Sequence, residues 1–211
     1  MDMPLYLAFT LFAFSSAFTP GPNNFMLMSS GALFGFKRTM PHITGVAVGF
    51  NFVMLAALLG MGAIVAQFPW SLTIVKIAGA TWLAWLGLKF FYAAFTHKDG
   101  EAKKTKAEER SRPFRFYEAV LFQWVNPKAL IMAIAAASAY MGISDDFKLR
   151  TLLILGTFLV MGFGSAGTWA IAGSTLNRLM SKGRPAIALN IIMGILLFGT
   201  ALMILMAKTS H

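Results

Sequence analysis

The sequence contains no cysteine and has few charged residues. Without cysteine the chain can form no disulfide, no thiolate metal site and no cysteine nucleophile. Lys, Arg, Asp and Glu make up 12 % of its 211 residues, about half the share that is typical of a soluble domain. Hydrophobic residues make up 57 %, and the mean hydropathy is +0.68. A composition this apolar indicates an integral membrane protein.

Long runs without charge set the number of membrane spans. Each run exceeds the ~20 residues that a helix needs to cross a ~30 Å hydrocarbon core. The runs cover residues 3–36, 39–75, 151–177 and 185–207. Helix breakers divide them, so we expect an all-α fold with six transmembrane helices. Their expected positions are about 5–33, 41–66, 71–95, 115–140, 150–176 and 185–207.

Lys and Arg are divided unevenly between the expected loops. With the N-terminus outside, twelve of them fall on the inner side and three on the outer side. The inner group is Lys37, Arg38, Lys98, Lys103, Lys104, Lys106, Arg110, Arg112, Arg115, Arg178, Lys182 and Arg184, and the outer group is Lys148, Arg150 and Lys208. Because basic residues collect in cytoplasmic loops, we expect both termini outside. The net charge of +10 would also suit a nucleic-acid partner, but the loop distribution accounts for it, and we expect no such partner.

The six helices divide into two units of three with opposite orientation. We therefore predict a 3+3 inverted-topology repeat, a common plan of secondary transporters. Residues 1–95 form the first repeat, 96–113 a charged cytoplasmic loop and 114–211 the second repeat. Matching helices of such a repeat should carry matching breaks. Helices 1 and 4 do, since "TPGPNN" at 19–24 and "QWVNPKA" at 123–129 each place an Asn beside a Pro.

The break in helix 1 frees backbone groups inside the membrane. Pro20 and Pro22 lack an N–H, so the carbonyls of Ser16 and Phe18 lose their helical partners, and Gly21 can leave helical geometry at low cost. Non-helical backbone at membrane depth is tolerated where it is buried in protein or lines a wet cavity. One interpretation is a proline kink that shapes helix packing. The other, favoured by the presence of two breaks, is a binding site.

Such a break suits a zwitterion. The half-helix that ends near Thr19 offers carbonyl oxygens to an ammonium group, and the half-helix that begins near Asn23 offers N–H groups to a carboxylate. Asn23 and Asn24 fit as a cap and as side-chain donors or acceptors. The residues of this break therefore predict the binding of an amino-acid substrate.

Helix 4 adds a positive charge to the expected site. Lys128 lies in the otherwise uncharged run 119–144, and an ionisable residue inside a membrane indicates function because its insertion costs ~2.5–3.5 kcal/mol. Lys128 can hold the substrate carboxylate; alternatively, it satisfies carbonyls freed by Pro127 or extends to the membrane interface. Gln123 and Asn126 are three residues apart and share a helix face that can line the same cavity.

Two residues are candidates for carrying a proton. Glu118 is an acidic residue at the edge of the fourth span, and a partly buried carboxylate can carry the proton of an antiport cycle. The alternative, which we favour, is an ion pair with Arg112 or Arg115 at the interface. His42, directly after Pro41, can titrate near neutral pH.

Motifs for nucleotide binding and catalysis are weak or missing. "GFGSAG" at 162–167 has the glycine spacing of a dinucleotide fingerprint but lies inside an apolar run. The fingerprint also needs an acidic residue about 20 residues further on, and Arg184 is found there instead. Close helix packing explains it better, as it does "GVAVG" at 45–49. There is no His-Glu-x-x-His motif, and the three histidines are scattered. We expect no enzyme activity, no cofactor and no metal site.

Four stretches carry a family resemblance. The segments "FTPGPNN" (18–24), "GFKRTMPHITGVAVGF" (35–50), "ATWLAWLGLKFF" (80–91) and "FQWVNPKAL" (122–130) resemble the LysE/RhtB family of bacterial amino-acid exporters. The resemblance covers nearly the whole chain. It implies efflux of amino acids or close derivatives from the cytoplasm, driven by the proton gradient. The two family motifs carry over onto Pro20, Gly21, Pro22 and Asn23, and onto Asn126, Pro127 and Lys128.

These observations predict a proton-coupled secondary exporter with alternating access in the bacterial cytoplasmic (inner) membrane. Because no acidic residue lies at the breaks and Lys128 is positive, small neutral amino acids are favoured over lysine or arginine. Two alternatives are a cation channel lined by the freed carbonyls and a non-transporting membrane scaffold. The expected partners are the amino-acid substrate, the lipid bilayer and protons; the oligomeric state is open, a homo-oligomer included.

Overall fold

The protein is a bundle of helices. The computed structural model describes residues 1–68, 70–96, 112–179 and 184–206, and every regular element in these ranges is a helix. The α-helices are α1 (Met3–Phe18), α2 (Pro22–Phe34), α3 (Phe36–Ala56), α4 (Gly62–Gln67), α5 (Trp70–Thr96), α7 (Phe116–Phe122), α8 (Pro127–Ala139), α9 (Phe147–Leu179) and α10 (Arg184–Met206). A π-helical turn, η1 (Ala57–Met61), joins α3 to α4, and two 3₁₀ turns, η2 (Gln123–Val125) and η3 (Met141–Ile143), flank α8.

Helices lie in all six ranges in which spans were expected, and two to four of them qualify as membrane spans among the described residues. Two helical stretches are long and apolar enough to cross a membrane: Phe36–Gln67, which is kinked at Gly60 (φ 107°), and Phe147–Leu176. The number rises to four if each of the two bent pairs, α1–α2 and α7–α8, is one span. The helical architecture is therefore confirmed for the described ranges, whereas the 3+3 repeat and its domain limits stay predictions. Residues 97–111 of the predicted loop and the last residues, 207–211, lie outside the described part of the chain.

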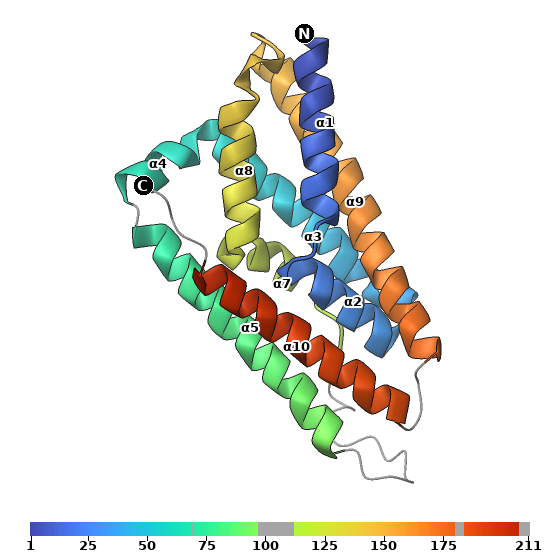
Figure 1. The fold of residues 1–211 in the computed structure, drawn as a ribbon. Coiled ribbons are helices and arrows are strands. Elements are labelled where there is room, and N and C mark those ends of the chain that lie inside the picture. The colour runs from blue at the N-terminus through green and yellow to red at the C-terminus, as the bar shows by residue number, and fades with distance from the viewer. Residues whose placement is uncertain (69, 97–111, 180–183, 207–211) are drawn as a thin grey trace.

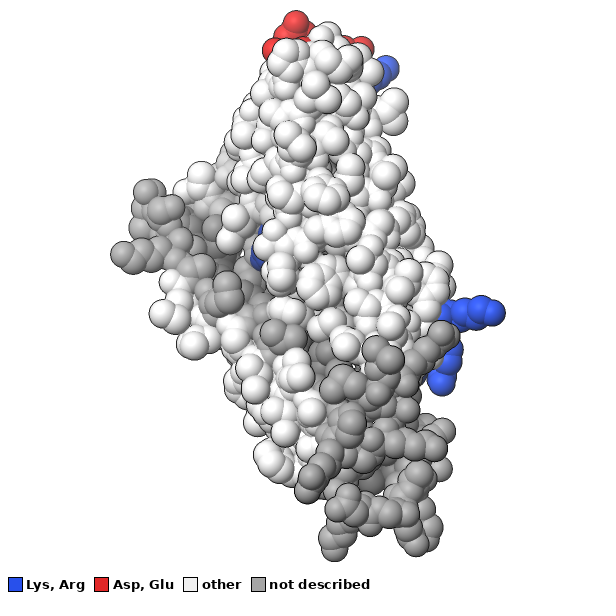
Figure 2. Space-filling view, turned by 45° about the vertical axis from the view of Figure 1, so that its right-hand side comes forward, with Lys and Arg blue, Asp and Glu red and all other residues white. Residues whose placement is uncertain are grey.

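Large apolar side chains cover the outside of the bundle. Leu11, Leu152 and Val160 are about 70 % exposed, which a water-facing surface rarely tolerates over so wide an area. Figure 2 shows one face on which acidic atoms gather at the end where α1 begins, while the sides below carry little visible charge. This distribution fits a molecule whose sides face lipid.

A single residue connects the first two spans. Gly35 has φ 77° and ψ 163°, a backbone conformation that favours glycine. Lys37 and Arg38, expected in a loop, lie exposed in the first turn of α3. The basic residues at this end of the bundle are thus presented on a helix that begins directly after the turn.

Small residues allow close helix packing beside the two breaks. Any Cβ at Gly31 or Gly173 would collide with the backbone of the facing helix, so α2 and α9 pack almost backbone to backbone. A Cβ at Gly49 of "GVAVG" would lie 2.7 Å from the Cα of Val120 in α7, so the packing expected for that motif is confirmed. The pair α5 and α10 runs side by side at the edge of the bundle (Figure 1).

One cluster of buried apolar residues joins the four helices that surround the centre of the bundle. Phe9 of α1, Val53 of α3, Leu130 of α8 and Phe158 of α9 are buried in contact within it. Both broken helices are thereby held against α3 and α9. The breaks lie near the middle of the molecule's long dimension (Figure 1).

Candidate functional site

The first break separates α1 from α2. The chain bends by 51° between Phe18 and Pro22, and Gly21 there is fully extended, with φ −175° and ψ 179°. Thr19 is also extended, with φ −60° and ψ 132°. The predicted break in helix 1 is therefore present, with three residues outside helical geometry between the two half-helices.

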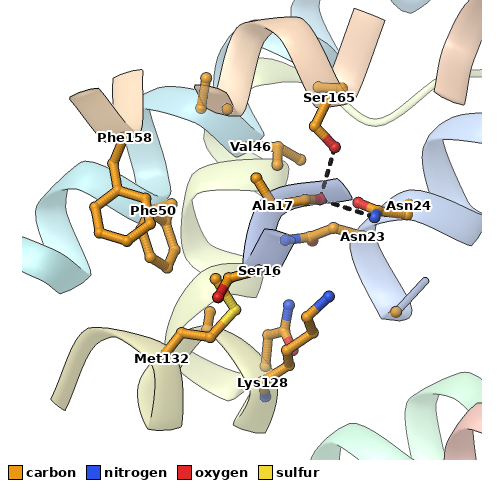
Figure 3. Close-up of a pocket in the computed structure, with 16 residues that line it drawn as sticks. Ser16, Ala17, Asn23, Asn24, Val46, Phe50, Lys128, Met132, Phe158 and Ser165 are labelled. Atoms are coloured by element: carbon orange, nitrogen blue, oxygen red, sulfur yellow. Dashed lines mark hydrogen bonds between the residues drawn. The ribbon is translucent and has the colours of Figure 1, made fainter. Parts of the chain in front are cut away.

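Side chains from three elements occupy the carbonyls that this break frees. The Ala17 carbonyl accepts hydrogen bonds from Asn24 Nδ2 (3.1 Å) and from Ser165 Oγ of α9 (2.7 Å). The Thr19 carbonyl accepts from Asn24 Nδ2 (2.9 Å) and from Lys128 Nζ of α8 (2.5 Å). Figure 3 shows Asn24 and Ser165 converging on Ala17. The end of α1 is thus a cluster of acceptors held by α2, α8 and α9.

The second break lies between α7 and α8 and is sharper. The chain bends by 70° there. Asn126 is the N-cap of α8, and its Oδ1 accepts from the backbone N–H of Lys128 at 3.1 Å. Pro127 follows at the first helical position, where its missing N–H costs nothing. The predicted break in helix 4 is therefore also present.

A reciprocal amide pair joins the two breaks. Asn23 Nδ2 donates to Gln123 Oε1 at 2.7 Å, and Gln123 Nε2 donates to Asn23 Oδ1 at 3.1 Å. Gln123 is fully buried and also donates to the Ala119 carbonyl at 2.9 Å. Because each amide satisfies the other, the pair fixes the first turn of α2 against the last turn before the second break.

Lys128 makes a second link between the breaks. It is half-buried, and its ammonium group reaches from α8 to the Thr19 carbonyl. Its side chain runs so close to Gly21 that a Cβ on that residue would lie 2.8 Å from Lys128 Cδ. The glycine of the "PGP" motif therefore has a packing role, since it leaves room for the lysine.

A cavity of about 60 Å³ opens beside these links. It is lined by Ser16, Ala17, Gly21, Asn23, Asn24, Val46, Ala47, Phe50, Asn126, Lys128, Ala129, Met132, Phe158, Gly162, Ser165 and Ala166. Figure 3 shows Lys128, Asn23 and Asn24 toward one side and the rings of Phe50 and Phe158 toward the other. The lining contains no acidic side chain. The cavity thus has a polar, cationic end and an apolar end.

The sequence-predicted binding residues divide into two groups. Five of them line the cavity: Gly21, Asn23, Asn24, Asn126 and Lys128. The other four, Pro20, Pro22, Gln123 and Pro127, belong to the breaks but are not among its lining residues. The two prolines that begin α2 and α8 set the half-helix ends, and Gln123 acts through Asn23.

The two proton-carrier candidates lie away from the cavity. Glu118 makes a two-point ion pair with Arg112 at 2.6 and 2.7 Å, and its Oε2 accepts from the Arg115 N–H at the start of α7. His42 is buried and stacks on Phe114, with ring centroids 5.1 Å apart. Its Nδ1 is buried and has no hydrogen-bond partner among the described residues. Neither residue lines the cavity.

Sequence reasoning missed the wall that α3 and α9 supply. Phe50, Phe158 and Ser165 line the cavity but carry neither charge nor a helix break. The available signal was spacing, because Phe158, Gly162 and Ser165 recur at intervals of four and three and so share one face of α9. The close helix packing expected for the "GFGSAG" motif is not found, because a Cβ at Gly162 or Gly164 would make only ordinary contacts at 3.5 and 3.7 Å and one at Gly167 would meet nothing within 4 Å. The motif instead lines the cavity at Gly162 and Ser165.

Comparison with known proteins identifies the family. Residues 14–208 match the family described as LysE type translocator. The cysteine/O-acetylserine efflux protein of Escherichia coli O139:H28 (strain E24377A / ETEC) is 28 % identical over 207 residues, which cover 97 % of this chain and 99 % of that protein. Proteins of the same name from Escherichia coli K12 and Shigella sonnei Ss046 are 28 % identical over 200 residues, 93 % of this chain and 95 % of theirs. No solved structure matches the chain. The chain therefore belongs to the LysE type translocator family, and it is a transporter rather than an enzyme.

Proposed function

We propose that this chain exports small neutral amino acids or their close derivatives from the bacterial cytoplasm. The observation that carries the proposal is the meeting, at one cavity, of the Lys128 ammonium group with the carbonyl end of α1. The relatives named above, which are cysteine and O-acetylserine efflux proteins, support this substrate class. Both of those substrates are small and carry a zwitterionic backbone.

The two half-helix ends match the two charges of a zwitterion. Ser16 and Ala17 bring the last turn of α1 to the cavity, where its carbonyl oxygens carry partial negative charge suited to an ammonium group. Lys128 and the Asn23 amide lie beside the start of α2 and can hold a carboxylate. The polar end of the cavity therefore offers both complements of the amino-acid backbone within one site.

Lys128 changes partner when substrate binds. Without substrate its ammonium group donates to the Thr19 carbonyl at 2.5 Å. A carboxylate is a stronger acceptor than a neutral carbonyl, so an entering substrate draws the ammonium group away from Thr19. The Thr19 carbonyl is then released toward the substrate ammonium group, and one of the two links between the breaks opens. Substrate binding is thereby coupled to the geometry of both broken helices.

The size and charge of the cavity set the substrate class. The cavity of about 60 Å³ is small, which favours substrates with short side chains over bulky ones. A second positive charge on the substrate would face Lys128 with no acidic residue in the lining to offset it. Small neutral amino acids are therefore favoured over lysine and arginine.

The transport cycle we propose is alternating access in the inner membrane. The broken helices α1–α2 and α7–α8 correspond to each other in an inverted repeat with both termini outside, and they move relative to α3 and α9. The candidates for proton coupling stay Glu118 and His42, which lie near the start of α7 rather than at the cavity, although the ion pair of Glu118 with Arg112 matches the alternative favoured for this carboxylate. Proton movement would then act on the contacts of α7 and not on the substrate itself.

Counterflow in proteoliposomes tests this function. Wild-type protein and Lys128→Ala are reconstituted, and exchange of labelled alanine, serine, cysteine and O-acetylserine is followed with and without an imposed pH gradient. We expect saturable exchange that the gradient stimulates and that Lys128→Ala loses while remaining in the membrane. Non-saturating cation currents in planar bilayers, without counterflow, would support the channel alternative instead.

A further inference from the structure

We propose that Gly162 of α9, facing Ala47 of α3, limits the size of the substrate side chain. This inference rests on the proposed function and concerns the apolar end of the same cavity. If Lys128 and the end of α1 hold the charged backbone, then the side chain must point toward the remaining wall. That wall comes from α3, α8 and α9.

The far end of the wall is fixed in place. Phe50 and Phe158 pack with ring centroids 4.9 Å apart, and Phe9 of α1 packs behind Phe158 at 5.3 Å. Phe158 is 2 % exposed and Phe9 is fully buried within the central apolar cluster. The Phe158 ring is packed between Phe9 and Phe50 and so has little free space to move into. A longer substrate side chain therefore cannot gain room by displacing this aromatic end.

The width of the cavity beside its aromatic end depends on the absence of a side chain at Gly162. Gly162 lies one helical turn after Phe158 on the same face of α9, and both residues line the cavity. A Cβ at Gly162 would contact the Cα and Cβ of Ala47, each at 3.5 Å, and no other described atom within 4 Å. This is ordinary van der Waals contact, so an alanine fits without strain. Because Gly162 and Ala47 both line the cavity, atoms added at Gly162 take part of their volume from it.

A single carbon is significant at this scale. In a cavity of about 60 Å³, the volume of one added methyl group is a substantial share of the space. In hydrophobic pockets one methylene changes discrimination by about 10- to 200-fold. Gly162→Ala should therefore penalise long substrate side chains more than short ones.

The test compares substrate preference in two matched pairs of variants. Gly162→Ala and Gly162→Val are compared with Gly156→Ala and Gly156→Val, on the same helix. Gly156 is exposed, and a Cβ there meets nothing within 4 Å, so it reproduces the backbone change without entering the cavity. Counterflow efficiency is measured for alanine and O-acetylserine in each protein. Ala47→Gly, which enlarges the same space, provides an opposite change.

We expect the ratio of O-acetylserine to alanine efficiency to fall by about tenfold or more in Gly162→Ala, to fall further in Gly162→Val and to rise in Ala47→Gly. The Gly156 variants should keep the wild-type ratio. Normal wild-type counterflow with an unchanged ratio in the Gly162 and Ala47 variants would overturn this inference alone. Absence of counterflow for every amino acid in the wild type would overturn the proposed function, and this inference with it.

Discussion

Replacing Lys128 by methionine removes the cation of the site and keeps most of its side-chain volume. The ammonium group makes one charge-assisted hydrogen bond, to the Thr19 carbonyl at 2.5 Å, and lies half-buried beside the cavity. A hydrogen bond with a charged partner contributes about 1.5–3 kcal/mol. If substrate carboxylate takes over this bond, Lys128→Met weakens binding by roughly 10- to 150-fold.

Substrate analogues separate a binding role from a structural one. The half-saturation concentration is measured in counterflow for alanine and for alaninamide, which lacks the carboxylate. Lys128→Met should raise the half-saturation concentration for alanine. It should leave the half-saturation concentration for alaninamide unchanged or lower it, because the variant removes a cation that faces a substrate without a carboxylate.

Lys89→Met is the matched control. Lys89 is exposed and lies 3.7 Å from the centroid of the Trp85 ring on α5, away from the cavity lining. It should behave as the wild type. Equal losses for alanine and alaninamide in Lys128→Met would show a general defect, and an unchanged value for alanine would refute the assignment of the carboxylate to Lys128.

Three further predictions concern the breaks, the proton and helix packing. Asn23→Ala should lower stability by about 1–3 kcal/mol because the fully buried Gln123 amide loses its partner, and Gln123→Ala should cost less because the remaining Asn23 is half-buried at the cavity. Thermal unfolding in detergent should show the double variant losing less than the sum. Glu118→Gln should abolish stimulation of transport by a pH gradient and retain counterflow if this carboxylate carries the proton, whereas stimulation equal to wild type would remove it as a candidate. Gly173→Ala should prevent α2 from packing on α9 and strongly reduce folded protein in the membrane, while Gly156→Ala should leave the yield unchanged.

The sequence predicted the features that depend on backbone chemistry. Prolines and glycine located both breaks, because a missing N–H and low-cost extended geometry act within a few residues. The uncharged runs located the helices, because the bilayer thickness sets their length. Lys128 could also be identified from the local sequence, because a charge in an apolar run is costly inside a membrane.

The features that sequence reasoning missed depend on which helices meet. Nothing local shows that Asn23 and Gln123, a hundred residues apart, form an amide pair. Likewise, Phe158 and Ser165 resemble ordinary helix residues until α9 is placed against the first break. Asn23 and Asn24 were expected as a cap and as side-chain donors or acceptors. The cap was wrong, because Gly21 is the N-cap of α2 and no side chain caps it. Asn24 is a donor, to the carbonyls of Ala17 and Thr19.

Accessibility of an engineered thiol at Ser16 tests most directly the central claim that the cavity at the breaks is the substrate site. The chain contains no cysteine, so Ser16→Cys introduces its only thiol, and Ser16 lines the cavity. The rate of modification by a membrane-impermeant methanethiosulfonate is measured in inside-out vesicles, with and without saturating alanine. Lys37→Cys, at an exposed position in the first turn of α3 on the side predicted to face the cytoplasm, serves as the control. The account predicts that alanine slows modification of Ser16→Cys and leaves Lys37→Cys unaffected; a rate at Ser16→Cys that no amino acid changes, in protein that performs counterflow, would contradict it.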